Sequence, residues 1–210
     1  MGKCVIFCAG EFNGLLEPVG PEDTVIAADA GIRHLAALGI VPDIVLGDFD
    51  SLGYIPQGAA VFPVEKDDTD AMLAIRRGLQ MGHRHFVIYG GLDGPRLDHT
   101  IANLQALQFL ADHGAEGYLV GLRQVAAVVT ADISFPASAA GILSLFCMGS
   151  PAAGITLTGL QYPLTDARLD SGFPLGVSNH FTGAPAHIEV KSGTLLAIYD
   201  RENGFPVRKE

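Results

Sequence analysis

The sequence has no tryptophan, only three cysteines and no hydrophobic run near the length of a membrane span. A spanning helix needs about 20 apolar residues, so we expect no transmembrane segment. The opening stretch MGKCVIFCAGEF has a short apolar run followed at once by acidic Glu11, which argues against a signal peptide. The odd cysteine number, with Cys4 and Cys8 inside an apolar stretch, predicts reduced, buried thiols and a cytoplasmic location. The Cys-x3-Cys spacing of Cys4 and Cys8 has no second pair, so we expect no zinc site.

Basic residues are also scarce. Lysine and arginine number 13 against 23 aspartates and glutamates, which gives a formal net charge of −10. Such a charge repels phosphate backbones and anionic lipids, so we expect neither nucleic acid nor a membrane as a partner. An acidic protein can still bind a polyanionic substrate when metal ions lie between them. The low charged fraction of 17% and the hydrophobic fraction of 49% are typical of a compact globular chain.

The first part of the chain alternates two kinds of pattern. Short β-branched runs predict strands within residues 3–9, 23–29, 43–48, 59–64, 85–91 and 117–121. Helical spacing of apolar residues predicts helices within 31–39, 67–82 and 96–114, with Gly39 and Gly114 as helix ends. This alternation predicts an α/β domain with a mainly parallel sheet flanked by helices. The expected buried faces of the helices are Ile32, Leu35 and Leu38; Met72, Ile75 and Leu79; and Leu97, Ile101 and Leu104.

From about residue 125 the pattern changes to short runs broken by glycine, proline and aspartate. Six such runs lie within residues 124–136, 141–149, 154–160, 176–183, 186–193 and 194–200. Regular turn signals without helical periods predict an antiparallel β-sandwich or barrel. We therefore expect two domains, residues 1–124 and 125–210. His83 and His85, at the beginning of the strand at 85–91, are interpreted as solvated surface residues.

Acidic residues follow three of the strands predicted in the first domain. The first ends in Asp29, the second in Asp48 and Asp50, and a third leads to Asp67, Asp68 and Asp70. Ligands of open α/β sheets bind beyond the carboxyl ends of the strands. If the chain stays extended, Asp48 and Asp50 point to the same side.

Carboxylates about 5 Å apart repel each other by roughly 3 kcal/mol at an effective dielectric of 20, so such a cluster needs protons or a cation. Oxygen ligands alone select Mg2+, Mn2+ or Ca2+ over zinc. The alternative is local: Asp67, Asp68 and Asp70 can cap a helix, and Asp50 can belong to an ordinary turn. Acids at three strand ends of one sheet favour the metal site.

A second cluster lies in YGGLDGPRLDHTIANL, residues 89–104, between a strand and a helix. Its glycines allow close backbone approach to a ligand, and the helix start offers free amides to a phosphate. An arginine adds donors suited to phosphate oxygens. The alternative is that Asp98 caps the helix and pairs with Arg96. The combination favours an anion site formed by Gly90, Gly91, Gly94 and Arg96, with Asp98 and His99 beside it. Neither a P-loop nor a GxGxxG motif is present.

Together these stretches resemble the thiamine pyrophosphokinase (thiamine diphosphokinase) family. The matching segments are AADAG (27–31), PDIVLGDFDS (42–51), EKDDTDAMLA (65–74), GGLDGPRLDHTIANL (90–104), GILSLF (141–146), GLQYPL (159–164) and GVSNHF (176–181). They occur in the family's order and span nearly the whole chain. The resemblance implies an N-terminal α/β catalytic domain, a C-terminal β-sandwich that binds thiamine, and a homodimer with active sites between subunits. It also implies the reaction of ATP with thiamine to give thiamine diphosphate and AMP.

The resemblance further implies site residues. The acidic metal cluster, for Mg2+, corresponds to Asp29, Asp48, Asp50 and Asp70, of which Asp48, Asp50 and Asp70 are the candidate catalytic residues. Either Asp48 or Asp70 is then the candidate base for the thiamine hydroxyl. The ATP side corresponds to Lys66, Asp67, Thr69, Gly90, Gly91, Arg96, Asp98 and His99. The thiamine-contacting surface corresponds to Ser178 and Asn179.

One departure from the family concerns the thiamine rings. Animal members have a tryptophan near the thiamine, and this chain has none. The residue that covers the rings is therefore open, with Phe181 as a candidate. Rival functions are a diphosphokinase acting on a hydroxymethylpterin, a non-catalytic thiamine- or nucleotide-binding protein, and a structural Ca2+ module. The β domain with GVSNHF disfavours the first, the four carboxylates the second, and the Gly-Arg anion site the third.

Overall fold

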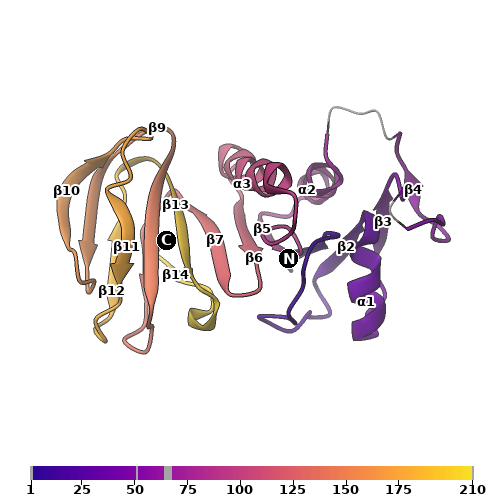
Figure 1. Cartoon of the computed structure of the whole chain (residues 1–210), viewed down its shortest axis with the longest axis horizontal. Coiled ribbons are helices and arrows are strands. Elements are labelled where there is room, and N and C mark those ends of the chain that lie inside the picture. The colour runs from indigo at the N-terminus through magenta and orange to yellow at the C-terminus, as the bar shows by residue number, and fades with distance from the viewer. Residues whose placement is uncertain (1, 51, 64–67, 210) are drawn as a thin grey trace. The chain divides into compact units, whose positions relative to one another are not determined.

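The computed structural model describes residues 2–50, 52–63 and 68–209. It divides into two compact units, Met1–Leu122 and Arg123–Glu210 (Figure 1). The boundary expected between residues 124 and 125 falls close to this division, at the first residue of β7 (Gln124–Val129).

The N-terminal unit is built on a parallel sheet. Its strands are β1 (Cys4–Phe7), β2 (Thr24–Ala28), β3 (Ile44–Gly47), β4 (Ala60–Val61), β5 (His85–Tyr89) and β6 (Glu116–Val120). They pair in the order β6-β5-β1-β2-β3-β4, and every pair is parallel. The central strand β1 is buried over its whole length, as its unbroken apolar sequence requires when helices cover both faces.

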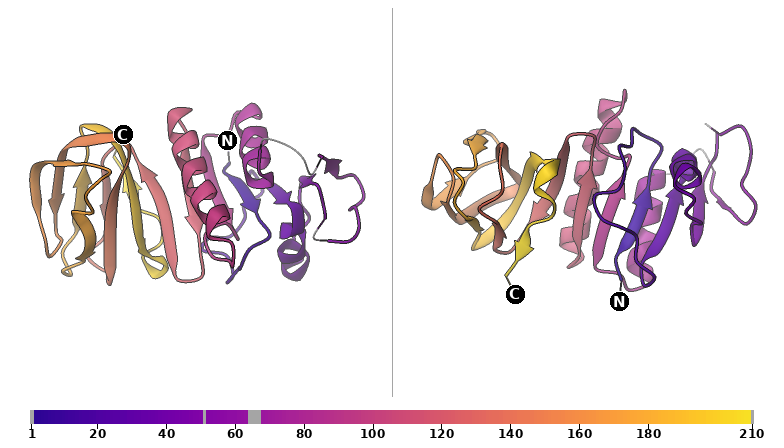
Figure 2. Two further views of the ribbon diagram at one scale, coloured as in Figure 1. Left: turned by 45° about the horizontal axis from the view of Figure 1, so that its top comes forward. Right: turned by 90° about the horizontal axis from the view of Figure 1, so that it is seen from below.

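Three α-helices flank this sheet: α1 (Ile32–Leu38), α2 (Asp70–Gln80) and α3 (Leu97–Asp112). Figures 1 and 2 show α2 and α3 on one face and α1 on the other. Gly39 ends α1 in the left-handed conformation, with φ 68°, as expected from its position. Gly114, with φ 65°, lies just beyond the end of α3. The strand–helix alternation predicted from the sequence is therefore present in this unit.

The buried faces of α1 and α2 differ in detail from the prediction. In α1 only Leu35 is fully buried, while Leu38 is 38% exposed. In α2 the deepest side of the helix consists of Ala71, Ala74, Ile75 and Gly78, and the larger Met72 and Leu79 lie at its margins. Close packing explains this choice, because a Cβ at Gly78 would lie 2.5 Å from the Phe86 ring.

For α3 the predicted buried face is wrong. Leu97 is 71% exposed and Ile101 51% exposed, whereas Asn103, Ala106, Leu107 and Leu110 are buried. The physical reason is that Leu97 and Ile101 lie on another side of α3 from these buried residues. Apolar residues spaced by three and four predicted the helix, but this spacing did not show which side of it packs against the strands.

The C-terminal unit contains strands and a single 3-10 turn at Arg201–Asn203. Its pairing order is β14-β8-β12-β9-β13-β7, with β10 and β11 also pairing β9, and all the pairs are antiparallel. The buried aromatic residues Phe135 and Tyr199 lie at its centre, with ring centroids 4.9 Å apart. Besides β7, the strands are β8 (Ile133–Phe135), β9 (Ile142–Thr158), β10 (Leu164–Leu169), β11 (Gly176–His180), β12 (Ala186–Glu189), β13 (Ser192–Asp200) and β14 (Val207–Arg208).

The sequence misdescribed two parts of this unit. The two runs predicted at 141–149 and 154–160 form one strand, β9, which continues through Pro151 and past the positive-φ residues Gly149 and Gly154. Glycine can adopt such angles within a bent strand, so the apparent breaks are irregularities of pairing and not ends. The strands β10 and β14 were not predicted.

The interpretation of the two histidines is wrong for His83. Its side chain is buried, and its two ring nitrogens lie 3.0 Å from the Gly2 carbonyl oxygen and 2.9 Å from Thr24 Oγ1. It joins the loop before β5 to the beginning of β2. His85 is partly exposed and lies 3.3 Å from Glu116. Among the described helices, none is long and apolar enough to cross a membrane.

Candidate metal and anion site

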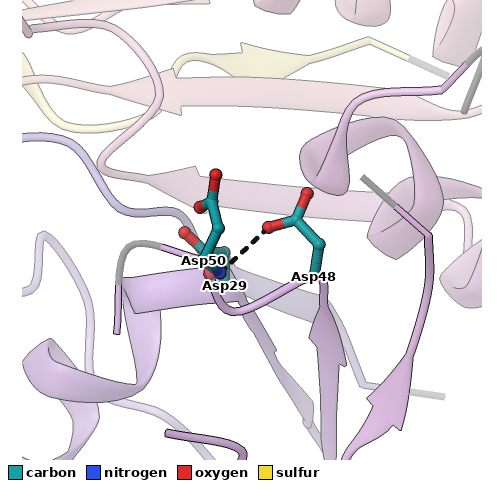
Figure 3. A group of neighbouring side chains, drawn as sticks. All are labelled: Asp29, Asp48 and Asp50. Atoms are coloured by element: carbon teal, nitrogen blue, oxygen red, sulfur yellow. Dashed lines mark hydrogen bonds between the residues drawn. The ribbon is translucent and has the colours of Figure 1, made fainter. Parts of the chain in front are cut away.

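Three carboxylates meet beyond the carboxyl ends of β2 and β3. One oxygen from each of Asp29, Asp48 and Asp50 lies within 4.8 Å of the others (Figure 3). Asp29 is buried, Asp48 is half-buried and Asp50 is exposed. Parallel strands bring their ends to one edge, so the arrangement follows from the order β2–β3.

The local geometry of Asp48 and Asp50 is a turn, so the expectation of an extended segment is wrong. The strand β3 ends at Gly47, and Phe49 has φ 60°, in the left-handed region. The Asp50 amide donates a hydrogen bond of 3.2 Å to Asp48 Oδ1, marked in Figure 3. Phe49 is 3% exposed and packs with Ala30 and Leu52. Burial of this ring holds a strained backbone that directs the two acids to one place.

Glycine allows Asp29 to approach its neighbours. A Cβ at Gly31 would lie 1.9 Å from the Phe7 carbonyl oxygen, so the 3-10 turn Asp29–Gly31 packs directly on the end of β1. Gly47 has φ 151°, and a Cβ there would lie 3.0 Å from the Asp29 Cα. Asp29 itself has φ 49°. The segments AADAG and VLGDFD therefore form one closely packed corner.

A cavity of about 430 Å³ joins two acids of this cluster, though not Asp50, to the glycine-rich loop after β5. Asp29, Asp48 and Asp70 line it, as do Gly90, Gly91, Gly94, Arg96 and His99. The two clusters predicted from the sequence therefore share one space within the N-terminal unit. The remaining lining residues are Cys8, Ala9, Gly10, Ala28, Asp68, Thr69, Ala71, Asp93, Pro95, Thr100 and Asn103.

The acidic segment before α2 serves two purposes. Thr69 is the N-cap of α2, and its hydroxyl accepts a hydrogen bond of 3.2 Å from the Met72 amide. Asp68 accepts a hydrogen bond of 2.9 Å from Arg76. The N-cap is therefore Thr69, which the helix-capping alternative did not name, while Asp70 lies in the first turn of α2 and lines the cavity. The expected ATP contacts Lys66 and Asp67 lie outside the described residues.

Arg96 and Asp98 form an exposed bidentate ion pair at the start of α3, with N–O distances of 2.9 and 2.6 Å. Hydrogen bonding from Arg96 lowers the pKa of Asp98 to about 2, and the pair raises the pKa of Arg96. The pairing half of the local alternative is therefore correct. The N-cap residue is Arg96, whose side chain makes no capping hydrogen bond, but the Asp98 carboxylate lies in the first turn and accepts a hydrogen bond from the His99 backbone. Arg96 and His99 still line the cavity, so the guanidinium is held beside it.

Among the cavity residues that were not selected from the sequence, four carry a thiol, carboxylate, hydroxyl or carboxamide group: Cys8, Asp93, Thr100 and Asn103. Asp93 accepts a hydrogen bond of 2.6 Å from the Leu122 amide. Asn103 is a polar residue on the buried side of α3, where apolar residues surround it in the sequence. This polar residue among apolar neighbours could have identified Asn103 as a candidate site residue, because buried polar groups need hydrogen-bond partners.

The burial of the cysteine thiols predicts which of them can react with a thiol reagent. Burial, with a contribution from Asp70, raises the pKa of Cys8 to about 12, and burial alone raises the pKa of Cys4 to about 12. Cys147 is only half-buried, so the prediction of a buried thiol is wrong for it. We expect a thiol reagent at pH 8 to modify Cys147 alone in the folded protein, and all the thiols after denaturation, because the thiolate is the reactive form.

The raised pKa values of Cys4 and Cys8 also determine how the stability of the fold depends on pH. A raised pKa means that the folded chain holds the thiol proton more tightly than the unfolded chain. The stability that Cys4 and Cys8 contribute is therefore complete below the ordinary thiol pKa of 9.0 and is lost as pH rises towards about 12. Rapid modification of Cys8 in the native protein at pH 8 would contradict this description.

The expected thiamine contacts lie on β11 and differ from each other in their surroundings. Asn179 is 5% exposed, and its carboxamide bonds both the amide and the carbonyl of Tyr162, at 2.9 and 2.8 Å. Ser178 is exposed with φ 59°, and its amide donates 3.0 Å to Ser144 Oγ. Within this unit Asn179 therefore fixes the segment at Tyr162, while Ser178 is presented to solvent.

Phe181 is half-buried and packs against the core of its unit. Its ring lies edge-on to Phe135 with centroids 5.2 Å apart. We expect Phe181→Ala to lower the free energy of unfolding by about 2 kcal/mol, because it removes aromatic packing. Denaturant titration measures this, with Phe173→Ala as the control, since Phe173 is 66% exposed. Equal stability of the two variants would show that Phe181 does not contribute to this packing.

The donor set of the carboxylate cluster suits a hard divalent cation. Its ligand atoms are all carboxylate oxygens, and its members range from buried to exposed, so a cation can reach them. Mg2+ prefers such oxygens and commonly completes its shell with water and substrate phosphates. A cation beside the Gly-Arg loop would let the cavity accept a polyphosphate.

Comparisons with known proteins agree on one family. The model of the thiamin pyrophosphokinase catalytic domain matches residues 19–119, and that of the thiamin pyrophosphokinase vitamin B1 binding domain matches residues 131–195. The thiamine pyrophosphokinase of Bacillus subtilis (strain 168) is 28% identical over 189 residues, covering 82% of this chain and 85% of that protein.

Solved structures show the same fold. The crystal structure of thiamine pyrophosphokinase from Bacillus subtilis has a TM-score of 0.81 at 23% identity, covering 94% of this chain and 98% of its own. That of thiamin pyrophosphokinase from Geobacillus thermodenitrificans has a TM-score of 0.76 at 25% identity, covering 95% and 97%. The structural similarity therefore covers both units of this chain.

Proposed function

The chain belongs to the thiamin pyrophosphokinase family, and from this premise we propose that it transfers the diphosphoryl group of Mg-ATP to the hydroxyl of thiamine. The products are thiamine diphosphate and AMP. The observation that carries the proposal is the shared cavity, which joins the carboxylate cluster to the glycine-rich loop and Arg96. Transfer of a diphosphoryl group needs both the carboxylate cluster and this loop, because the reaction depends on positioning of the phosphates and on neutralisation of their charge.

The proposed metal ligands are Asp29, Asp48 and Asp50, with Asp70 on the same cavity. When bound, Mg2+ supplies positive charge to the phosphates and makes the β-phosphorus a better electrophile. Asp48 or Asp70 is the proposed acceptor of the thiamine hydroxyl proton, since a carboxylate near the reacting oxygen can act as a general base.

The proposed ATP contacts are Gly90, Gly91, Arg96 and His99, which line the cavity, and Asp98, which orients Arg96. The Arg96 guanidinium offers a planar fork to phosphate oxygens while Asp98 keeps it in position. Lys66, Asp67 and Thr69 remain proposed members of the neighbouring segment, and Thr69 also caps α2.

The proposal assigns different roles to the two units. The parallel α/β unit binds metal and ATP, and the antiparallel unit, as a β-sandwich, binds thiamine through Ser178 and the segment that Asn179 fixes. We include a homodimer with active sites between subunits and a cytoplasmic location. The family resemblance supports the first, and the three free cysteines support the second.

The test is substrate dependence of AMP formation. The protein is incubated with Mg-ATP and either thiamine, a hydroxymethylpterin or no acceptor, and AMP is measured by chromatography. We expect AMP only with thiamine. AMP formed with the pterin instead would favour the rival diphosphokinase, and ATP binding without turnover of either acceptor would favour a non-catalytic nucleotide-binding protein.

A further inference from the structure

The loop after β5, Gly90–Asp93, has four consecutive carbonyl groups that all accept hydrogen bonds from elsewhere in the N-terminal unit. The Gly10 and Glu11 amides donate to Gly90 and Asp93, at 3.0 and 3.3 Å. Two side chains of α3 hold the middle of the loop: Asn103 Nδ2 donates 2.8 Å to the Gly91 oxygen, and Thr100 Oγ1 donates 3.1 Å to the Leu92 oxygen. Both sides of the loop are therefore anchored through its carbonyls.

This anchoring determines the direction of the amides. In a trans peptide the N–H of a residue points opposite to the preceding C=O, and the described residues contain no cis peptide. The amides of residues 91–94 consequently point away from Gly10, Glu11, Asn103 and Thr100. Within residues 2–50, 52–63 and 68–209, none of these amides finds an acceptor. Successive unpaired N–H groups form an anion-binding concavity.

Asn103 connects this loop with the cavity. It is 9% exposed, lines the cavity, and uses its Nδ2 for Gly91, while its Oδ1 accepts from no described residue. Its Oδ1 is not among the fully buried atoms that lack a partner, so this oxygen remains accessible to solvent or to a ligand. Asn103 and Thr100 also lie one turn apart on α3, so one helix fixes two adjacent peptide groups.

We propose that Asn103 and Thr100 are positioning residues that hold the Gly91 and Leu92 carbonyls against α3 and so direct the loop amides at the diphosphate of the bound nucleotide. The proposal rests on the proposed function for the identity of the nucleotide. It gives α3 the role of a support for the loop, in addition to any attraction at its own N-terminus.

Matched variants separate this role from a structural one. Thr100→Val removes the hydroxyl and keeps the shape, Thr100→Ser keeps the hydroxyl, and Asn103→Ala removes the carboxamide. Gln105→Ala is the control, since Gln105 is exposed on the same helix. We expect Thr100→Val and Asn103→Ala each to raise the KM for Mg-ATP about tenfold, as for loss of one hydrogen bond that positions a charged ligand. Thr100→Ser and Gln105→Ala should match the unmodified protein, and the KM for thiamine should not change.

Binding of Mg2+-pyrophosphate, followed by calorimetry without thiamine, keeps this test independent of turnover. Weakened pyrophosphate binding in Thr100→Val that is restored in Thr100→Ser supports the inference even if the protein does not use thiamine. Equal pyrophosphate affinity in Thr100→Val, Thr100→Ser and the unmodified protein would overturn it. Equal rises in the KM for ATP and for thiamine would overturn it as well. If Asn103→Ala does not fold, the two Thr100 variants decide the question.

Discussion

Replacing Asp50 by asparagine is expected to reduce turnover about a thousandfold and to leave the fold intact. Asp50 is the exposed member of the carboxylate cluster, and its oxygen lies within 4.8 Å of oxygens from Asp29 and Asp48. The substitution keeps the shape of the side chain but removes a negative charge that a divalent cation requires. It also removes repulsion among the carboxylates, so the free energy of unfolding should stay the same or rise.

Steady-state rates of AMP formation and a thermal melt measure both parts of this prediction. Asp112→Asn is the matched control, because it removes the same charge from an exposed position near the end of α3, away from the cavity. The control should retain its rate. A near-normal rate in Asp50→Asn would remove Asp50 from the metal site, and a large fall in melting temperature would mean that the residue has a structural role.

Gly31→Ala is expected to destabilise the chain by about 3 kcal/mol. A Cβ at this position would overlap the Phe7 carbonyl oxygen at 1.9 Å, and backbone atoms cannot rotate away as a flexible side chain can. The end of β1 or the turn bearing Asp29 would have to move. We therefore expect loss of metal-dependent activity in whatever fraction remains folded.

Chemical denaturation of Gly31→Ala beside Gly20→Ala measures the effect. A Cβ at Gly20 would make only an ordinary contact of 3.5 Å with Asp23, so the control should be close to the unmodified protein in stability. Equal stability of the two variants would contradict the close packing of the AADAG turn on β1.

The sequence predicted the parallel unit and the edge that carries the acids because these depend on strong, regular signals. Apolar runs such as Cys4–Phe7 are buried on both faces, and strands of one direction bring their carboxyl ends together. From that rule Asp29, Asp48 and Asp50 were expected to lie together with the acids before α2; the first three do meet, and Asp70 lines the cavity beside them. The resemblance to the thiamine pyrophosphokinase family then supplied the chemistry, which carboxylates alone do not specify.

The details that sequence reasoning missed depend on contacts between distant segments. The left-handed Phe49 is held by packing against Ala30 and Leu52, which no local pattern reports. The exposure of Leu97 and Ile101 depends on which side of α3 packs against the rest of the unit. The role of Asn103 depends on its hydrogen bond to the Gly91 carbonyl, which lies 12 residues earlier in the chain and follows from no local pattern. The roles of the individual site residues remain predictions that the variants above address.

We propose that a diphosphoryl group is moved whole from ATP to thiamine at the acid cluster. Phosphorus NMR of a single reaction with Mg-ATP and thiamine tests it most directly, because every phosphorus-containing product is observed together. We expect AMP and thiamine diphosphate in equal amounts from the unmodified protein, and neither AMP nor thiamine diphosphate from Asp50→Asn. Accumulation of ADP with thiamine monophosphate, or an unchanged spectrum with the unmodified protein, would contradict it.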